Sequence, residues 1–261
     1  MKIRDIIGAL EEYAPLPLQE SYDNAGLQIG LTVDAETSGV LLCLDVTEDV
    51  IYEAKKKGCN LIISHHPLIF HAPKRLTGAD FVERCIILAI QQGINIYACH
   101  TNLDNTLGGV NYKIAEKLKL TGLTPLIPQP DMQGAGSGLI GMLPKTVERE
   151  DFIADVKEIF NVGSLRYNSW TGEKISVVAL CGGAGAFLIP NAIKAGADAF
   201  ITGEIGYHRF FGYENDIQLM EIGHFESEQY TIDLLKKILH DYFPDLTVKK
   251  TNVETNPINY L

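Results

Sequence analysis

Residues 39–66 read GVLLCLDVTEDVIYEAKKKGCNLIISHH. An apolar run leads into an amphipathic stretch that closes on Gly58, and a second apolar run then ends in two adjacent histidines. Short apolar runs bounded by turn signals predict buried strands, and a glycine after a periodic stretch is typical of a helix C-terminus. This stretch therefore predicts a strand, a helix and a second strand parallel to the first.

The same alternation extends along most of the chain. Predicted helices cover residues 2–12, 48–58, 81–93, 110–120, 148–160, 187–196 and 226–243, and predicted strands cover 39–45, 60–64, 94–99, 138–144, 174–183, 197–203 and 217–223. A turn and a short strand are predicted within YDNAGLQIG, residues 22–30. We therefore expect an α/β fold with largely parallel strands.

Residues 121–138 interrupt this pattern. They are rich in Pro and Gly and show no periodicity, so they predict a boundary or a crossover. We expect a first α/β unit at residues 1–124 and a second at 125–261, with the C-terminal helix and strand packing back on the first.

The two halves also resemble each other. In the first half, Cys43 is followed by Gly58, and in the second half Cys181 is followed by Gly196 at the same spacing. When the halves are aligned on these residues, SHH at 64–66 falls on TGE at 202–204. A chance likeness between two strand–helix–strand units is the alternative. A duplication predicts two similar units whose strand ends converge on one metal cleft, because ligands of open α/β sheets bind at the carboxyl ends of the strands.

Five polar side chains stand at or just beyond these predicted strand ends. They are His65, His66, Asp104, His224 and Glu228. Imidazoles suit Zn, Fe, Co or Ni, carboxylates add oxygen ligands, and a carboxylate can bridge two ions. The set predicts a site for one or two divalent metal ions, with Glu228 in the first turn of the last long helix and His224 just before it.

A histidine pair that is merely hydrogen-bonded in a loop is the alternative interpretation of SHHP at 64–67. His100 is ambiguous, because it is either a ligand or a partner that orients Asp104 or a ligand histidine. Glu204 and His100 are the candidate proton-transfer residues, on the basis of their predicted position near the cleft alone.

Composition restricts the class of protein. The net charge is −11, which disfavours nucleic-acid binding. The five cysteines form no CxxC pair and lie mostly in apolar runs, which predicts buried free thiols and a cytoplasmic location. No apolar run is long enough to predict a membrane span.

Several motifs together resemble the GTP cyclohydrolase 1 type 2 homologue family, also called the NGG-interacting factor three-like family. They are SHHP, HTNLDN, the CGGAG and GADAFITGE segments, GHFESE, DNAGLQIG near the N-terminus and TNPINYL at the end. The resemblance spans nearly the whole chain. It implies a pair of divalent metal ions held by His65, His66, Asp104, His224 and Glu228 between two α/β domains, and a toroidal homohexamer.

The resemblance also implies the compact form of the family, because the segment at 121–138 is too short for an inserted domain. It suggests a metal-dependent hydrolase that acts on GTP or another small molecule, with two ions that could be Zn, Fe, Co, Mn or Mg. No triphosphate-binding motif is evident in the sequence. A non-catalytic metal-binding, metal-handling or regulatory protein is the alternative.

Overall fold

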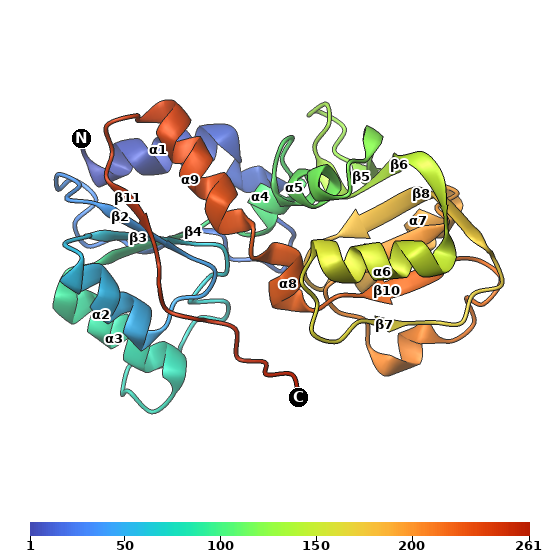
Figure 1. Ribbon diagram of the computed structural model, residues 1–261. Coiled ribbons are helices and arrows are strands. Elements are labelled where there is room, and N and C mark those ends of the chain that lie inside the picture. The colour runs from blue at the N-terminus through green and yellow to red at the C-terminus, as the bar shows by residue number, and fades with distance from the viewer. The chain divides into compact units, whose positions relative to one another are not determined.

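The computed structural model describes all 261 residues. The chain divides into two compact units (Figure 1), namely unit 1 with residues 1–103 and 231–257, and unit 2 with residues 104–230 and 258–261. Unit 1 contains a five-stranded sheet and unit 2 a six-stranded sheet. Two α/β units, each with its own sheet, confirm the predicted fold class.

The sheet of unit 1 is parallel at its centre. Its strands are β1 (Gly26–Ile29), β2 (Val40–Cys43), β3 (Leu61–Ser64), β4 (Asn95–Ala98) and β11 (Val248–Lys250). Their order is β1-β4-β3-β2-β11, and only β1 runs antiparallel. Every residue of β2, β3 and β4 is buried, as expected where helices cover both faces of a parallel sheet.

Helices cover both faces of this sheet, as Figure 1 shows. They are α1 (Ile3–Tyr13), α2 (Glu48–Lys56), α3 (Phe81–Gln92) and α9 (Thr231–Tyr242), and a short 3-10 turn, η1 (Leu16–Leu18), follows α1. Leu41, Ile62 and Ile96 pack in one cluster with apolar residues of α2 and α3. Helices α1 and α9 contact each other, and α9 also contacts β2.

Unit 2 combines parallel and antiparallel strands. They are β5 (Thr121–Pro128), β6 (Gly136–Glu148), β7 (Arg166–Tyr167), β8 (Lys174–Cys181), β9 (Ala199–Thr202) and β10 (Gln218–Glu221). In the order β5-β6-β8-β9-β10-β7, the strands β8, β9 and β10 are parallel and the remaining pairs are antiparallel.

The helices of unit 2 also lie on both faces of its sheet. They are α5 (Val110–Lys117), α6 (Arg149–Ile159), α7 (Ile189–Lys194) and α8 (His224–Glu228), with the 3-10 turns η2 (Gly185–Leu188) and η3 (Tyr207–Phe210). Helices α5 and α6 contact β6 and β8. Apolar residues of η2 and α7 form a cluster with Ala179, Phe200 and Leu219 of the sheet.

The segment at residues 121–138 is not a crossover, so that part of the prediction was wrong. It forms β5 and the beginning of β6, which pair with each other. Strand β5 lies at the edge of the sheet and is largely exposed, so it has no alternation of apolar and polar residues. An edge strand also tolerates Pro125 and Pro128, because one side of its backbone needs no partner.

The boundary between the units differs from the expected position between residues 124 and 125. It falls between Leu103 and Asp104, within the short helix α4 (Thr101–Asn105). The physical reason is that α5 packs on β6, β8 and α8 of unit 2. The C-terminal α9 and β11 belong to unit 1, where β11 pairs with β2.

The predicted helix at residues 226–243 is in fact two helices. Helix α8 begins at His224 and ends at Glu228, and α9 begins at Thr231. The chain passes from unit 2 to unit 1 between Tyr230 and Thr231, so one continuous helix cannot serve both units. His224 is therefore the first residue of a short helix, and Glu228 is its last.

The internal repeat is visible in the strand register. Cys43 lies opposite Ser64 in the β2–β3 pair, and Cys181 lies opposite Thr202 in the β8–β9 pair. These are the residues that the sequence offset aligns. In both units the strand that follows in sequence then adds a further parallel partner, β4 in unit 1 and β10 in unit 2.

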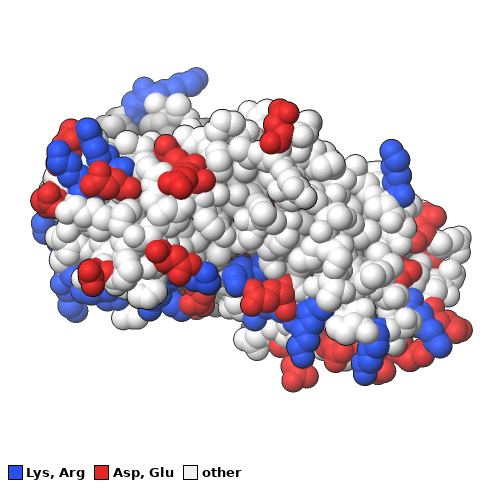
Figure 2. Space-filling model, turned by 90° about the horizontal axis from the view of Figure 1, so that it is seen from above, with Lys and Arg blue, Asp and Glu red and all other residues white.

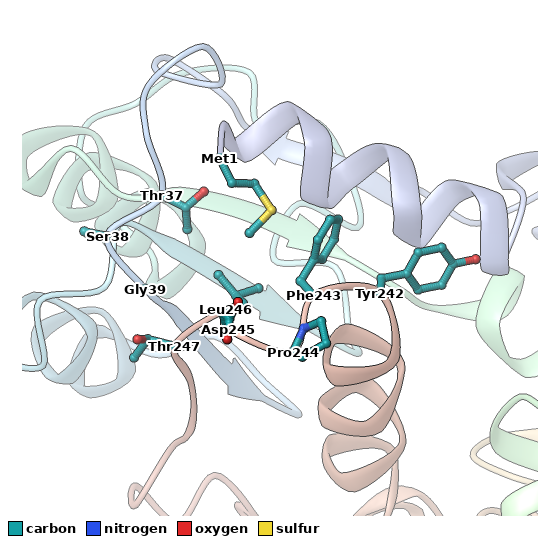
Figure 3. A pocket seen from close by; sticks show the side chains of 10 residues that line it. All are labelled: Met1, Thr37, Ser38, Gly39, Tyr242, Phe243, Pro244, Asp245, Leu246 and Thr247. Atoms are coloured by element: carbon teal, nitrogen blue, oxygen red, sulfur yellow. The ribbon is translucent and has the colours of Figure 1, made fainter.

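Unit 1 has an open pocket of about 470 Å³, shown in Figure 3. Its lining includes Met1, Gly39, Phe243, Leu246 and Thr247. Gly39 directly precedes β2 and Thr247 directly precedes β11, so the pocket lies at the amino ends of these strands. The histidines of SHHP follow the carboxyl end of β3, at the other edge of the sheet.

The charged side chains do not form a continuous basic area on the face drawn in Figure 2, where acidic and basic groups are interspersed. This agrees with the net charge of −11. No helix has the length and apolar character needed to cross a bilayer.

Candidate metal centre

Three histidines of unit 1 converge at the carboxyl edge of its sheet. His65 and His66 directly follow β3, and His100 follows β4 by two residues. The ring centroids lie 4.9 Å apart for His65 and His66, 5.4 Å for His65 and His100, and 5.5 Å for His66 and His100. One ring nitrogen from each histidine lies within 4.8 Å of one from each of the others, a spacing that could hold a metal ion.

Each of these histidines has a hydrogen-bond acceptor at Nδ1. The Nδ1 of His65 lies 2.7 Å from the carbonyl oxygen of Cys99, and that of His66 lies 2.7 Å from Oδ1 of Asp45. The Nδ1 of His100 lies 2.6 Å from Oδ1 of Asp23. A carbonyl or a carboxylate can only accept, so Nδ1 carries a proton, and in the neutral imidazole the lone pair then lies on Nε2. This is the usual arrangement of a metal-binding histidine.

The sequence predictions did not include Asp23 and Asp45. Asp23 also accepts hydrogen bonds from the amide of Asn24, at 2.6 Å, and from the amide and hydroxyl of Thr101. Burial acts to raise the pKa of Asp23, but the hydrogen bonds that it accepts, that from His100 above all, outweigh burial and lower this pKa. Asp23 is thus held as a carboxylate that orients His100. DNAGLQIG was the available signal, but its role was not evident without the structure.

Unit 2 brings together a histidine and two carboxylates. In α8, Nε2 of His224 lies 3.1 Å from Oε2 of Glu228, one helical turn along. Nδ1 of His224 lies 2.7 Å from Oε1 of Glu204. A carboxylate oxygen of Asp104 lies within 4.8 Å of one of Glu228. Glu228 therefore stands next to both other candidate ligands of this unit, and Glu204 orients His224.

Two close-packed glycines fix the position of α8. A Cβ at Gly183 would lie 2.4 Å from Oε1 of Glu228, and the φ of +59° at Gly183 is itself one that favours glycine. A Cβ at Gly203 would lie 2.9 Å from Cα of His224 and from Oγ of Ser227. The Ser227 hydroxyl also accepts a hydrogen bond from the amide of Gly183 at 3.0 Å. The GGAG segment thus packs tightly against α8.

The backbone at Asp104 is tied to the same loop. Asn111 Nδ2 donates to the carbonyl oxygen of Asp104 at 3.1 Å, and Asn111 Oδ1 accepts from the amide of Gly182 at 2.9 Å. One buried side chain thereby joins α4 to the loop after β8. Asn111 is a further supporting residue that the sequence reasoning missed.

The C-terminal residues reach both groups of side chains. In unit 1, the Thr255 hydroxyl donates to Oδ2 of Asp45 at 3.3 Å. In unit 2, Tyr260 is hydrogen-bonded to Glu226 of α8, and burial together with the charge of Glu226 raises the pKa of Tyr260. The closing TNPINYL segment thus supports an orienting carboxylate and a ligand helix.

The donor set fits a divalent metal ion. Imidazole Nε2 atoms and carboxylate oxygens suit several divalent ions, and the partners at Nδ1 fix the direction of the imidazoles. The cysteines are less suitable as metal ligands, because burial raises the pKa of the Cys43 and Cys99 thiols well above the usual range of a thiol and so disfavours the thiolate. No disulfide is formed by any of the five cysteines.

A family model described as Duf34/NIF3 (NGG1p interacting factor 3) matches residues 1–257. The chain belongs to this family. A Clostridium perfringens protein named GTP cyclohydrolase 1 type 2 homolog is 38% identical over 229 residues, which cover 87% of each chain. A Lactococcus lactis protein with the same name is 37% identical over 211 residues, which cover 80% of this chain and 79% of that one.

Solved structures agree with this assignment to the Duf34/NIF3 family. A Staphylococcus aureus crystal structure matches at a TM-score of 0.90 and 30% identity, covering 100% of this chain and 99% of that one. A Bacillus cereus protein related to NIF3 matches at a TM-score of 0.88 with the same coverage, and at 24% identity it supports the fold alone. The resemblance read from SHHP, HTNLDN and GHFESE is thereby confirmed.

Proposed function

We propose that this Duf34/NIF3 chain binds two divalent metal ions through His65, His66, Asp104, His224 and Glu228, and that it is a metal-dependent hydrolase of a small molecule. The observation that carries the proposal is the acceptor beside Nδ1 of every candidate histidine, which orients each imidazole as in metal-binding histidines. Glu228 would hold a metal together with Asp104 or His224, because it neighbours both within unit 2.

Bound metal ions would supply an activated water for attack on the substrate. The role of the chain's own residues is to hold the ligands and to move protons. His100 is the proposed proton-transfer residue, acting at Nε2, because Asp23 holds its Nδ1 proton. Glu204 is proposed to orient His224. The names of the relatives suggest GTP as the first substrate to test.

Metal analysis and turnover together test this proposal. The purified protein is treated with a chelator, reloaded with Zn, Fe, Co, Mn or Mg, and assayed with GTP. About two metal ions per chain with ion-dependent consumption of GTP support it. Two ions without turnover favour the alternative of a metal-handling or regulatory protein.

Variants separate the ligands from ordinary surface histidines. His65→Ala and Glu228→Ala are expected to lose most bound metal while staying folded. His240→Ala is the matched control, because His240 lies exposed on α9. Full metal content in both ligand variants would contradict the assignment.

We further propose a cytoplasmic location and a toroidal homohexamer. The five free cysteines, four of them buried, support a reducing compartment. The hexamer rests on the family resemblance. Native mass spectrometry tests it, and a monomeric protein at micromolar concentration would contradict it.

A further inference from the structure

Two exposed aromatic side chains stand beside the histidine cluster of unit 1. Tyr22 is 58% exposed and Phe70 is 39% exposed. The Phe70 ring meets the His100 ring edge-on, with centroids 6.2 Å apart and planes at 81°. The Tyr22 and Phe70 centroids are 6.4 Å apart. The two rings together are called the aromatic wall below.

The aromatic wall is held in place by hydrogen bonds between two segments of unit 1. Asn24 Nδ2 donates to the carbonyl oxygen of Ile69 at 2.5 Å, and the amide of Ile69 donates to Oε1 of Gln28 at 3.1 Å. Gln28 Nε2 in turn donates to the carbonyl oxygen of Asn24 at 2.7 Å. Tyr22 and Phe70 are thus adjacent to residues that are fixed to each other.

The exposure of these two rings favours a role in ligand binding over a role in stabilising the fold. Apolar rings gain little stability while they face water, whereas a planar ring that stacks on them removes apolar surface from solvent. Stacking on an aromatic side chain tolerates any flat π system, because every such ring has a π face. The edge contact between Phe70 and His100 would place a stacked ring beside the His100 imidazole.

We propose that Tyr22 and Phe70 form a binding subsite for a planar heteroaromatic ring of the molecule that acts at the metal centre. This proposal rests on the proposed function, and it adds the ligand class and two residues that determine specificity. The ring stacks on the aromatic wall while the remainder of the ligand extends toward the histidines.

Calorimetric titration of the zinc-loaded protein tests the subsite. GMP and UMP carry a planar ring, and ribose 5-phosphate lacks one but keeps the sugar and phosphate. Phe70→Leu and Tyr22→Leu keep an apolar side chain and remove the π face. Tyr52→Leu is the matched control, because Tyr52 is 55% exposed on α2. Zinc content and molar mass are measured for every variant.

We expect the parent to bind GMP at least about tenfold more tightly than ribose 5-phosphate, and Phe70→Leu to lose about tenfold in GMP affinity. Ribose 5-phosphate should bind all variants equally, and Tyr52→Leu should behave as the parent does. Equal GMP affinity in parent and Phe70→Leu would overturn the proposal, as would a parent without preference for the ring compounds.

Two further outcomes distinguish a ligand subsite from an interface and from a failure of the metal centre. A change in molar mass of Phe70→Leu or Tyr22→Leu with unchanged GMP affinity would overturn the subsite and indicate an interface between copies of the chain. A parent that binds no zinc would contradict the proposed function instead. The subsite still predicts a ring preference in chelator-treated protein, because the aromatic wall contains no metal ligand.

Discussion

Replacing Gly183 by alanine should damage the metal centre far more than it damages the fold. The new Cβ would lie 2.4 Å from Oε1 of Glu228 and 3.3 Å from Nε2 of His224. Glu228 is 2% exposed, so its carboxylate has little room to move aside. The clash is therefore relieved by a shift at the end of the Glu228 side chain. Such a shift disturbs metal coordination more than it disturbs the fold.

The magnitude has two parts. The φ of +59° costs an L-residue ~1–2 kcal/mol of stability, which lowers the free energy of unfolding. Gly196 has a φ of +78° with nothing within 4 Å of its Cβ position, so Gly196→Ala carries the backbone cost alone. Misplacing groups around a metal typically lowers affinity by ~10–100-fold. We expect that loss in Gly183→Ala only.

Competition with a chromogenic chelator measures the zinc affinity of both variants, and urea unfolding without metal measures their stability. The expected result is a similar loss of stability in both variants and a loss of zinc affinity in Gly183→Ala. Equal zinc affinity in the two variants would refute the reasoning that the glycine is required by the position of Glu228.

Two further predictions concern carboxylates of unit 1. Hydrogen bonds from the hydroxyl and the amide of Thr77 lower the pKa of Glu83 to about 2. The ionised Glu83 therefore stabilises the fold fully at a pH above 4.5, the ordinary pKa of the group. This contribution is lost as the pH falls toward 2. Glu83→Gln should therefore destabilise the protein in urea at pH 7, by an amount that shrinks below about pH 4.5. Thr255→Val removes a hydrogen bond to Asp45, which orients His66, and should lower zinc affinity about threefold to tenfold in chelator competition.

Each of these has a result that would contradict it. A pH-independent difference between Glu83→Gln and the parent would mean that the hydrogen bonds do not favour the ionised form. If Thr255→Val keeps the zinc affinity of the parent while Asp45→Asn loses about tenfold or more, then Asp45 supports His66 without help from the Thr255 hydroxyl, and the prediction for Thr255 is contradicted.

The central strands and the positions of His65 and His66 at a strand end were predictable, because their sequence signals are local. Parallel strands buried on both faces are short apolar runs, and polar residues that directly follow them must lie at one edge of the sheet. His65 and His66 are of this kind. The structure places both beside His100, in line with the expectation for strand ends within one unit.

The supporting carboxylates were not predictable in this way. Asp23 is 77 residues from His100 in sequence, and Asp45 is 21 residues from His66. Such partners follow from tertiary packing, which leaves no periodic signal. The edge strand β5 was not predicted for a related reason. An exposed strand has no buried face, so apolar and polar residues do not alternate along it.

The repeat was predicted correctly in register but not in every detail. Strands β4 and β10 end at Ala98 and Glu221, opposite equivalent residues of β3 and β9. His100 stands two residues after its strand and His224 stands three after its own. The two histidines are therefore not equivalent, which agrees with a ligand role for His224 and a separate role for His100.

The most direct test of the account is anomalous diffraction from crystals of the zinc-loaded protein, recorded at the zinc absorption edge. We expect two strong peaks per chain, contacted by Nε2 of His65, His66 and His224 and by carboxylate oxygens of Asp104 and Glu228. Zinc peaks only at other residues, or none at all after loading, would contradict it.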